Sequence, residues 1–583
     1  KYYNDLQKTF SQTIQIKRSL PMIYPPMPWK CAQIGSYYLR QTSFSKIFSE
    51  NVEGRNCYDS ANMLPVMRTL DHLSNIGWRI NAQVLDLIEY IWANGGGKAT
   101  IPMRFNEKLI TSDDIKSKPF KEKVALLRES QSYRELHSLR CDFMIKYQIA
   151  KDFSKVKEFY FPHNIDYRGR TYPISPHLNH IGNDFCRGLL EYSEGKALGK
   201  SGLKWMKVHL ANVIGKDKLP LKDRELYVDS IMDVVKRCAE NPYNNTEWQD
   251  TDNPWQVISA MIEVNNAIKS GDPSKYKTNL HCHVDGSCNG LQHYSALSKD
   301  YHGGFEVNLI NRDKPGDVYS KVLDIVLEKI RTESNPADVK YAKLLKESNC
   351  VNRKVVKQTV MTSVYGVTLI GARDQIKRQL ADKKLFDPNT LFSISMYLAK
   401  KTIESIGDLF REANQIKSWL TKCALVISHS GNCVKWVTPL GLPCIQPYRR
   451  LTNSELIKTH TQGVKIMTDF DNQPVNKRKQ GTAFPPNYIH SLDSTHMMMS
   501  CNRAIDSGIS FSSVHDSYWC HPSDIDQLNQ ILREEFVNLY SQPLLENLLE
   551  GFHQCYPELK FPEIPETGTL NLEEVKDSTY FFS

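Results

Sequence analysis

The chain has 583 residues, of which 40% are hydrophobic and 24% are charged, so it has the length of several domains and the composition of a folded protein, not a disordered one. It contains no run of about 18 apolar residues, which excludes a membrane-spanning helix and predicts no membrane partner. Lys and Arg total 74 against 65 Asp and Glu, a net charge of +9 that is compatible with a polyanionic partner without requiring one.

Cysteine usage and the start of the chain bear on its compartment. The 14 cysteines include no CxxC pair, which argues against a zinc ribbon or a disulfide framework and favours reduced thiols in an intracellular protein. The sequence starts at Lys1 with no signal peptide and no Arg-rich transit segment. We therefore expect a fragment or a processed form, and its sequence does not specify a cellular location.

The first third of the chain alternates proline-rich and helical patterns. Residues 20–29, LPMIYPPMPW, are expected to be extended because proline excludes helix there. Residues 75–92 have helical apolar spacing and stop at NGGG. Residues 132–153 predict an amphipathic helix, and 161–174, FPHNIDYRGRTYPI, bring tight turns, two arginines and two tyrosines together. The predicted apolar stripe of the 132–153 helix consists of Leu136, Leu139, Phe143, Tyr147, Ala150 and Phe153.

Residues 276–290 predict a strand that runs into a turn. Side chains alternate along a strand, so His281, His283 and Asp285 of HCHVDG point to one side. Alternate residues are about 7 Å apart, which is awkward for one tetrahedral zinc ion. A carboxylate with carbonyls and waters suits Mg²⁺ better. The alternative is an ordinary turn aspartate before glycine.

Residues 352–368, NRKVVKQTVMTSVYGVT, predict a helix that ends near Gly366. Arg353, Lys357 and Tyr365 recur at multiples of four residues and share one broad face. Cations spaced by four repel unless an anion lies between them, and a triphosphate is one such anion. The alternative is a solvated basic face.

Two late segments complete the pattern. Residues 485–499, PPNYIHSLDSTHMMM, predict a turn followed by a helix, and 509–519, ISFSSVHDSYW, predict a strand or hairpin that carries Asp516. Long helices together with separated strands favour the α+β class.

An aspartate on a strand, a helix with R-x3-K-x7-Y-G and a late strand with H-D follow the order of the three motifs of right-hand polymerases. DGSCNGLQHYSAL, RKVVKQTVMTSVYG, PPNYIHSLDSTH and VHDSYW resemble signature segments of the single-subunit RNA polymerases of phage, mitochondria and plastids. IDYRGRTYPI and the closing GTLNLEEVKDSTYFFS are similar to that family too, so nearly all of residues 20–583 is covered. LPMIYPPMPW and NGLQHY look closer to the mitochondrial branch than to the phage branch.

The resemblance implies a two-metal active site. Asp285 and Asp516 would hold two Mg²⁺ ions, with the carbonyl of Gly286 as a further ligand. Lys357 would contact the triphosphate and donate a proton to the leaving group. Arg353 would bind phosphate oxygens through its planar guanidinium group.

The resemblance also implies a surrounding substrate site. Tyr365 would stack at the insertion position and select ribonucleotides, with His490 near the 2′-hydroxyl. Tyr319 would be a further nucleotide-pocket residue. The resemblance places Arg170 and Tyr172 beside the nucleic acid, His515 in support of Asp516, and residues 581–583 against the active site.

The implied fold is an α+β right hand in which helix-rich fingers split the palm. The expected divisions are a remnant of an N-terminal domain at 1–95, a thumb at 96–157, the first part of the palm at 158–300, fingers at 301–490 and the second part of the palm with a C-terminal foot at 491–583. Residues of about 440–480 resemble by position a hairpin that reads promoter DNA, although their basic side chains are equally expected as phosphate contacts or a solvated loop. Most of the family's N-terminal domain is missing, which puts unaided promoter recognition in doubt.

The expected function is therefore DNA-directed, template-dependent RNA synthesis for an organellar genome. The expected partners are a DNA template, the RNA product, ribonucleoside triphosphates and mitochondrial transcription factors, with the chain as a monomeric catalytic subunit. The mitochondrial matrix is the expected location and a plastid is the alternative. A DNA polymerase is disfavoured, because Gly286, Ser287 and Cys288 stand where that class has a bulky residue and a glutamate. An inactive nucleic-acid-binding relative is the other alternative.

Overall fold

The computed structural model describes the chain in several stretches. These are residues 19–39, 42–46, 58, 61–104, 119–364, 366–383, 385–450, 454–458, 463–467 and 473–583. Side chains of 120, 121, 124–130, 132, 454–458 and 463–467 are outside that description.

A three-stranded antiparallel sheet lies at the centre of the fold. It consists of β10 (Cys282–Asp285), β16 (Ser517–Cys520) and β15 (Ser512–Val514), in the order β10-β16-β15. Cys282 pairs with Cys520 and Asp285 pairs with Ser517. The sheet thus confirms the predicted hairpin at 509–519. Within 276–290, the strand in this sheet is limited to Cys282–Asp285, because Lys277–Thr278 forms a strand of another sheet.

The other described strands form small antiparallel sheets. One sheet has three strands in the order β4-β3-β7, and the rest are strand pairs. These strands are β1 (Met27–Cys31), β2 (Ile34–Ser36), β3 (Gly77–Ile80), β4 (Phe159–Tyr160), β5 (His163–Ile165), β6 (Thr171–Pro173), β7 (Leu190–Tyr192), β8 (Lys196–Ala197), β9 (Lys277–Thr278), β11 (Lys435–Val437), β12 (Pro443–Ile445), β13 (Ser454–Lys458) and β14 (Gly463–Met467).

Helices make up most of the remaining structure. Those before β10 are α3 (Leu64–Asn75), α4 (Ala82–Ala93), α6 (Phe120–Phe153), α7 (Asp184–Leu189), α8 (Gly202–Ile214), α9 (Leu221–Ser230), α10 (Met232–Glu240) and α11 (Pro254–Lys269). Those after it are α12 (Asn289–Ser298), α13 (Tyr301–Glu306), α14 (Val318–Arg331), α15 (Val339–Ser348), α16 (Arg353–Ser363), α17 (Leu369–Ala381), α18 (Pro388–Leu409), α19 (Arg411–His429), α20 (Lys477–Asp506), α21 (Ile525–Tyr540) and α22 (Leu544–Cys555). Short 3₁₀ turns lie at Glu247–Asp250, Pro273–Lys275, Pro522–Asp524 and Leu572–Asp577.

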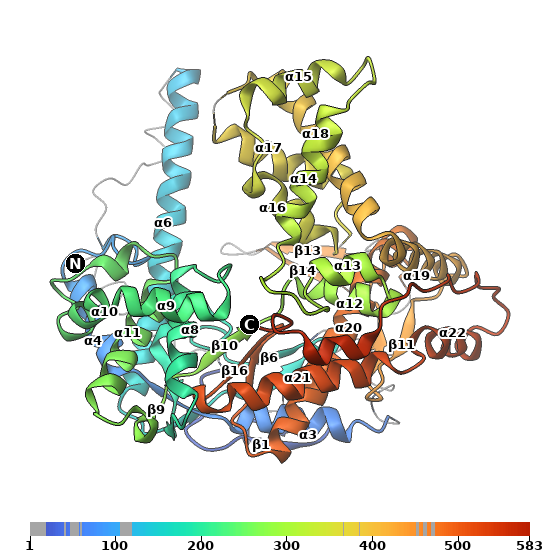
Figure 1. Ribbon diagram of the computed structural model, residues 1–583. Helices are drawn as coiled ribbons and strands as arrows, with labels where there is room; N and C mark the ends of the chain where they lie inside the picture. The colour runs from blue at the N-terminus through green and yellow to red at the C-terminus, as the bar shows by residue number, and fades with distance from the viewer. Residues whose placement is uncertain are drawn as a thin grey trace.

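The helices rise from a common base in two separate columns (Figure 1). One column is α6, and the other contains α14 to α18. The base between them holds β10, β16 and α21, with the C-terminal end of the chain nearby. The fold is therefore a mixture of helix and strand with its central sheet between two projecting parts.

Three of the sequence predictions need correction in detail. Residues 75–92 are not one helix, because Gly77–Ile80 pairs with two strands as β3, and α4 begins only at Ala82 after the cap Asn81. The predicted helix at 132–153 is longer and starts at Phe120. Leu139 of its predicted apolar stripe is 59% exposed, so the stripe is not buried along its whole length.

The predicted turn at 485 is wrong. Pro485 and Pro486 lie inside α20, which runs unbroken from Lys477 to Asp506. A proline inside a helix loses a hydrogen bond and costs about 3 kcal/mol. Both prolines and the neighbouring Phe484 are buried, and burial of apolar surface offsets that cost.

Within the predicted loop at 440–480, β13 and β14 form an antiparallel hairpin, in which Ser454 pairs with Met467 and Lys458 with Gly463. The basic residues of the segment NKRKQ (476–480), for which phosphate contacts and a solvated loop are equally expected, are exposed in the first turn of α20, which begins at Lys477. Among the described residues, no helix combines the length and apolar composition needed to cross a bilayer.

Candidate active site

Two acidic residues distant in sequence meet at the end of the central sheet. Asp285 is the last residue of β10 and is paired in register with Ser517, which directly follows Asp516. The backbone N–H of Gly286 donates to the carbonyl oxygen of Asp516 at 3.4 Å. Asp516 lies in the two-residue turn between β15 and β16, and the other turn residue, His515, has φ of +58°. This left-handed backbone is uncommon for a residue other than glycine.

The charge of Asp285 disfavours the charged form of Asp516. Burial raises the pKa of Asp285, against a hydrogen bond from Ser517 and the charge of Arg187. Burial also raises the pKa of Asp516, to about 6, and the charges of Asp493 and Asp285 add to the rise. Repulsion between neighbouring carboxylates is relieved by a cation between them.

The donor set suits a hard divalent cation such as Mg²⁺. It offers carboxylate oxygens and the Gly286 carbonyl, which accepts from the Cys288 N–H at 3.1 Å and keeps a second lone pair. Mg²⁺ takes few protein ligands and keeps several waters. Among the described residues, no group of three or more His, Cys, Asp or Glu is placed to hold a metal, so a zinc-type cluster at His281 and His283 finds no support.

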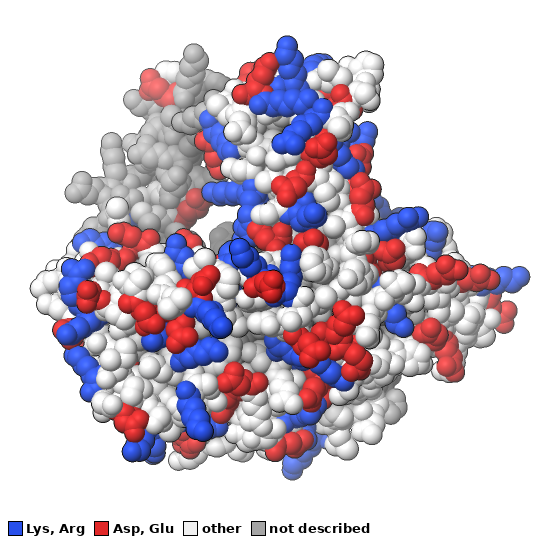
Figure 2. All heavy atoms as spheres, in the orientation of Figure 1, with Lys and Arg blue, Asp and Glu red and all other residues white. Residues whose placement is uncertain are grey.

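Asp285 opens onto a cleft of about 660 Å³. The side chain is exposed to this cleft although protein surrounds it closely. On the surface, Lys and Arg are intermixed with Asp and Glu around the hollow between the base and the upper helices (Figure 2). The residues that line the cleft come mainly from β10 and the following turn (His283, Asp285, Gly286, Ser287, Cys288), the α8–α9 loop (Gly215, Asp217, Lys218), the start of α14 (Asp317, Val318, Tyr319) and α16 (Arg353, Lys357, Met361).

The cations of α16 face this cleft as the four-residue spacing predicted. Arg353 makes a bidentate ion pair with Asp317, with Nε 2.6 Å from Oδ2 and Nη2 3.1 Å from Oδ1. Its guanidinium lies 5.0 Å from the centre of the Tyr319 ring. The Lys357 amine lies 5.9 Å from the same ring and is exposed. Lys357 is therefore open to a ligand, whereas Arg353 is held by a carboxylate.

Four other predicted residues lie together in a second group near Asp516 and not among the described residues that line the cleft. Nη2 of Arg170 donates to buried Asp493 at 2.8 Å. The rings of Tyr172 and His515 are 5.2 Å apart. The fourth member is His490, whose Nδ1 is 2.8 Å from Nη1 of Arg168.

His490 has a defined protonation state in this group. A guanidinium only donates, so Nδ1 of His490 accepts and the proton of the neutral ring is on Nε2. Burial, together with the charges of Arg170 and Arg168, keeps the pKa of His490 well below its usual range. The predicted residue Tyr365 lies outside the described residues.

The cleft also contains charged residues that the sequence did not identify. Arg187 at the end of α7 lies over the Trp519 ring at 5.7 Å and acts on the pKa of Asp285. Lys218 is in the α8–α9 loop, where its amine is 2.9 Å from Asp217. No local pattern marks either cation, because only the packing of α7 and α8 around β10 brings them to the cleft.

Residues near the end of the chain close the base of the site. Phe582 forms a β-bridge with Gly286, and the Ser583 N–H donates to the Asp285 carbonyl at 3.2 Å. Phe582 is 1% exposed, and Ser583 lines the cleft. The predicted packing of 581–583 against the site is confirmed.

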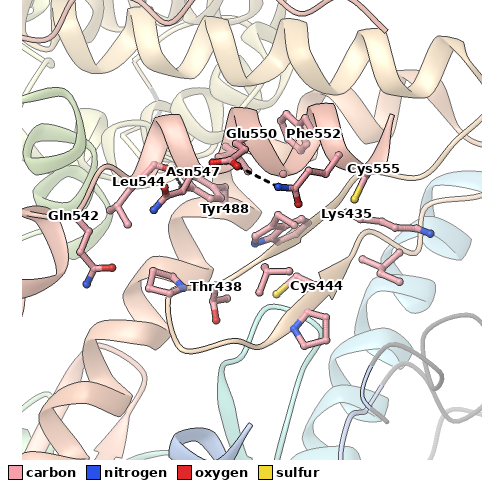
Figure 3. A pocket seen from close by; sticks show the side chains of 18 residues that line it. Lys435, Thr438, Cys444, Tyr488, Gln542, Leu544, Asn547, Glu550, Phe552 and Cys555 are labelled. Atoms are coloured by element: carbon pink, nitrogen blue, oxygen red, sulfur yellow. Dashed lines mark hydrogen bonds between the residues drawn. The ribbon is translucent and has the colours of Figure 1, made fainter. Parts of the chain in front are cut away.

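A second cavity, of about 510 Å³, lies between the β11–β12 hairpin and α22 (Figure 3). Among the described residues that line it, Lys435 is the one basic side chain. Glu550, its acidic side chain, accepts from Gln554 at 3.2 Å. This cavity lacks the several cations and the Asp285 carboxylate that line the cleft, so the cleft is the better candidate for an anionic substrate.

The sheet, the paired aspartates and the opposing cations define a site of the kind that binds a phosphate-bearing substrate together with divalent cations. The sequence model of the DNA-dependent RNA polymerase family matches residues 196–559, a range that contains both aspartates and Lys357. The chain belongs to this family, and the resemblance predicted from the sequence is confirmed.

Curated relatives extend the similarity over almost all of the chain. It is 44% identical over 582 residues to DNA-directed RNA polymerase 1, mitochondrial, of Nicotiana sylvestris, covering 97% of this chain and 57% of the relative. It is 44% identical over 581 residues to DNA-directed RNA polymerase 3, chloroplastic, of the same plant, covering 97% and 58%. It is 42% identical over 583 residues to DNA-directed RNA polymerase 2, chloroplastic/mitochondrial, of Arabidopsis thaliana, covering 97% and 57%. The chain thus spans less than two thirds of the length of these relatives.

Proposed function

We propose that this chain is the catalytic part of a DNA-directed RNA polymerase that transcribes an organellar genome. The observation that carries the proposal is the meeting of Asp285 and Asp516 beside a cleft whose opposite wall presents Lys357. The reaction adds a ribonucleoside monophosphate unit to the 3′ end of RNA on a DNA template and releases pyrophosphate. The family match supports this proposal.

Asp285, Asp516 and the Gly286 carbonyl are the residues that would hold two Mg²⁺ ions. Such ions supply stabilisation of the attacking and leaving oxygens in an in-line displacement. The raised pKa of Asp285 and Asp516, caused first by burial, supports this role, since a bound cation favours their charged forms. His515 supports Asp516 by forming the other half of its turn.

Lys357 and Arg353 serve the triphosphate. The exposed amine of Lys357 is free to approach phosphate oxygens and to donate a proton to the departing pyrophosphate. Arg353 is oriented by Asp317, so its planar group is held in place before substrate arrives. Tyr319, beneath both cations, forms a wall of the nucleotide pocket.

The group around His490 serves the sugar and the nucleic acid. His490, with its proton on Nε2, acts near the 2′-hydroxyl, and Tyr365 selects ribonucleotides. Arg170 and Tyr172 lie close to the nucleic acid beside Asp516. The small residues Gly286, Ser287 and Cys288 after the first aspartate leave room for a 2′-hydroxyl.

The right-hand division fits the arrangement of the helices. The α6 column corresponds to a thumb within 96–157, the α14–α18 column to fingers within 301–490, and the sheet-bearing base to a palm made of 158–300 and 491–583, with the foot at the end of the chain. The first 95 residues correspond to part of an N-terminal domain. The β13–β14 hairpin corresponds to a promoter-reading element.

The protein works as a monomeric catalytic subunit with a DNA template, RNA, ribonucleoside triphosphates and mitochondrial transcription factors as partners. The mitochondrial matrix is the proposed location and a plastid is the alternative, since relatives of both kinds match equally well.

The test is extension of a labelled RNA primer annealed to a DNA template, with Mg²⁺ present or chelated. We expect Mg²⁺-dependent extension with rNTPs, and its loss by about 10³-fold or more in Asp285→Asn and in Asp516→Asn while DNA binding survives. Extension at the wild-type rate by either variant would contradict the two-metal assignment. A strong preference for dNTPs would identify a DNA polymerase instead, and binding without extension by the wild type would identify an inactive relative.

A further inference from the structure

The loop between α8 and α9 brings two charged side chains to the cleft. Asp217 and Lys218 are exposed, line the cleft and form an ion pair with a distance of 2.9 Å. Burial raises the pKa of Asp285, and the charge of Lys218 opposes that rise. Lys218 is therefore close enough to Asp285 for its charge to act on that carboxylate.

This loop has backbone hydrogen bonds of its own, from the Lys216 N–H to the Ala211 carbonyl at 2.9 Å and from the Leu219 N–H to the Lys216 carbonyl at 3.1 Å. It follows Gly215, whose φ of +96° ends α8. Residues 215–218 are exposed, so the loop makes little packing contact. Fixing each residue of an exposed loop in one conformation costs about 1 kcal/mol or more in conformational entropy. Bonds from outside the loop therefore add to its own bonds in fixing the position of Lys218.

Arg224 supplies those bonds from inside the protein. Its side chain is fully covered, with a residue exposure of 1%. Nη2 donates to the Asp217 carbonyl at 2.7 Å and Nε donates to the Leu219 carbonyl at 2.8 Å, so the guanidinium holds the backbone on both sides of Lys218. Nη1 donates to the Asn212 side chain on α8 at 2.9 Å.

The same guanidinium reaches the end of the chain that contacts Asp285. Nη2 of Arg224 is 3.5 Å from the hydroxyl of Ser583, and the Ser583 N–H donates to the Asp285 carbonyl at 3.2 Å. The planar Arg224 guanidinium, with its fixed donor directions, thus contacts the loop, α8 and the C-terminal segment that pairs with Asp285. A lysine, with a single point charge, does not reproduce these directions.

We propose that Arg224 is a positioning residue that holds Lys218 in the cleft to bind the phosphates of an incoming ribonucleoside triphosphate. The inference rests on the proposed function of the cleft. Arg224 itself touches neither substrate nor metal, and it acts through the backbone of residues 217–219. The substrate class recognised by Lys218 is a nucleoside triphosphate, because the loop faces the same cleft as Lys357.

The kinetic test compares Arg224→Lys, Lys218→Met and the double variant in primer extension. We expect each single variant to raise KM for the rNTP about 10-fold with kcat changed less than about 3-fold. If Arg224 acts through Lys218, the double variant has the KM of Lys218→Met alone, within about 2-fold. An unchanged KM in Arg224→Lys, or single effects that multiply in the double variant, would overturn the proposal.

A structural readout separates this proposal from the function of the cleft. Hydrogen exchange of the peptide that contains 215–219 is expected to be faster in Arg224→Lys without any nucleotide, and slower exchange or no change would overturn the proposal. Asn212→Ala, which removes one acceptor, is a milder variant that should shift exchange the same way if Arg224→Lys does not fold.

Arg533→Lys is the matched control, because Arg533 is also buried and donates to the carbonyls of Ser578 and Thr579 but not to this loop. Arg533→Lys should lower Tm and leave exchange at 215–219 unchanged. If the wild type extends no primer, the proposed function fails, whereas the exchange result still tests the hold of Arg224 on the loop.

Discussion

Asp516 occupies an unfavourable place for a carboxylate. It is partly buried in a tight turn, and both Asp285 and Asp493 add negative charge nearby. Arg170 compensates in part, but its guanidinium is already paired with Asp493. A carboxylate whose charged form lowers the stability of the folded protein is typical of a functional site.

The raised pKa of Asp516 predicts how the stability of the folded protein depends on pH. The pKa of Asp516 is about 6 in the folded protein against an ordinary value of 3.8, so the folded state binds its proton more tightly than the unfolded chain. The contribution to stability is complete below pH 3.8 and is lost as pH rises through 6. In EDTA, we expect the free energy of unfolding of Asp516→Asn to equal that of the wild type near pH 4. At pH 7.5 we expect it to be higher than that of the wild type by about 1–2 kcal/mol.

Urea unfolding at the two pH values measures this difference. Mg²⁺ should stabilise the wild type more than Asp516→Asn, because binding to the folded state alone adds to its stability. A variant that is less stable than the wild type at pH 7.5 in EDTA would show that Asp516 is not under electrostatic stress.

At the scale of elements, Asp317 joins two helices of the cleft wall. Its carboxylate caps α14 by accepting from the Tyr319 N–H at 3.1 Å, and it also binds Arg353 at the start of α16. The sequence predicted α16 from its four-residue spacing. The ion pair between Asp317 and Arg353 had no sequence signal, since two whole helices, α14 and α15, separate its partners in the chain.

Two substitutions separate the two roles of Asp317. Asp317→Asn keeps a good cap and weakens the ion pair, so we expect a loss of about 0–1 kcal/mol in the free energy of unfolding. Asp317→Ala removes the cap as well and should cost about 1 kcal/mol more. Thermal unfolding of the three proteins checks the order, and equal stabilities of the two variants would mean that the cap contributes nothing.

At the scale of the whole molecule, residues from the last segment of the chain complete a site built on β10. Phe582 pairs with Gly286 and packs against Tyr518 at 5.1 Å between ring centres. A Cβ at Gly286 would lie 3.3 Å from the Phe582 ring. The position of Asp285 therefore depends on a residue almost at the other end of the sequence.

Phe582→Ala tests this dependence. We expect a loss of about 3–5 kcal/mol in the free energy of unfolding and a fall in kcat of about 10-fold or more, because the cavity lets the Asp285 strand shift. Phe582→Leu, which keeps most of the volume, should cost much less. Chemical denaturation and primer extension report the two effects, and an unaltered kcat in a folded Phe582→Ala protein would contradict the coupling.

The sequence by itself determined the chemical types and order of the site residues: an aspartate that ends a strand, a helix with cations four residues apart, and an aspartate in a hairpin. These signals are local, because strand alternation, helix spacing and turns act over a few residues. Local signals also misled at Pro485 and Pro486, where burial within α20 outweighed the loss of hydrogen bonds.

Only the tertiary structure decided which distant groups meet. It paired Asp285 with the turn of Asp516, held Arg353 against Asp317, brought Arg187 and Lys218 into the cleft, and separated the His490 group from it. Contacts of this kind arise when helices pack on a sheet and bury apolar surface, and that process leaves no mark on the spacing of residues along the chain.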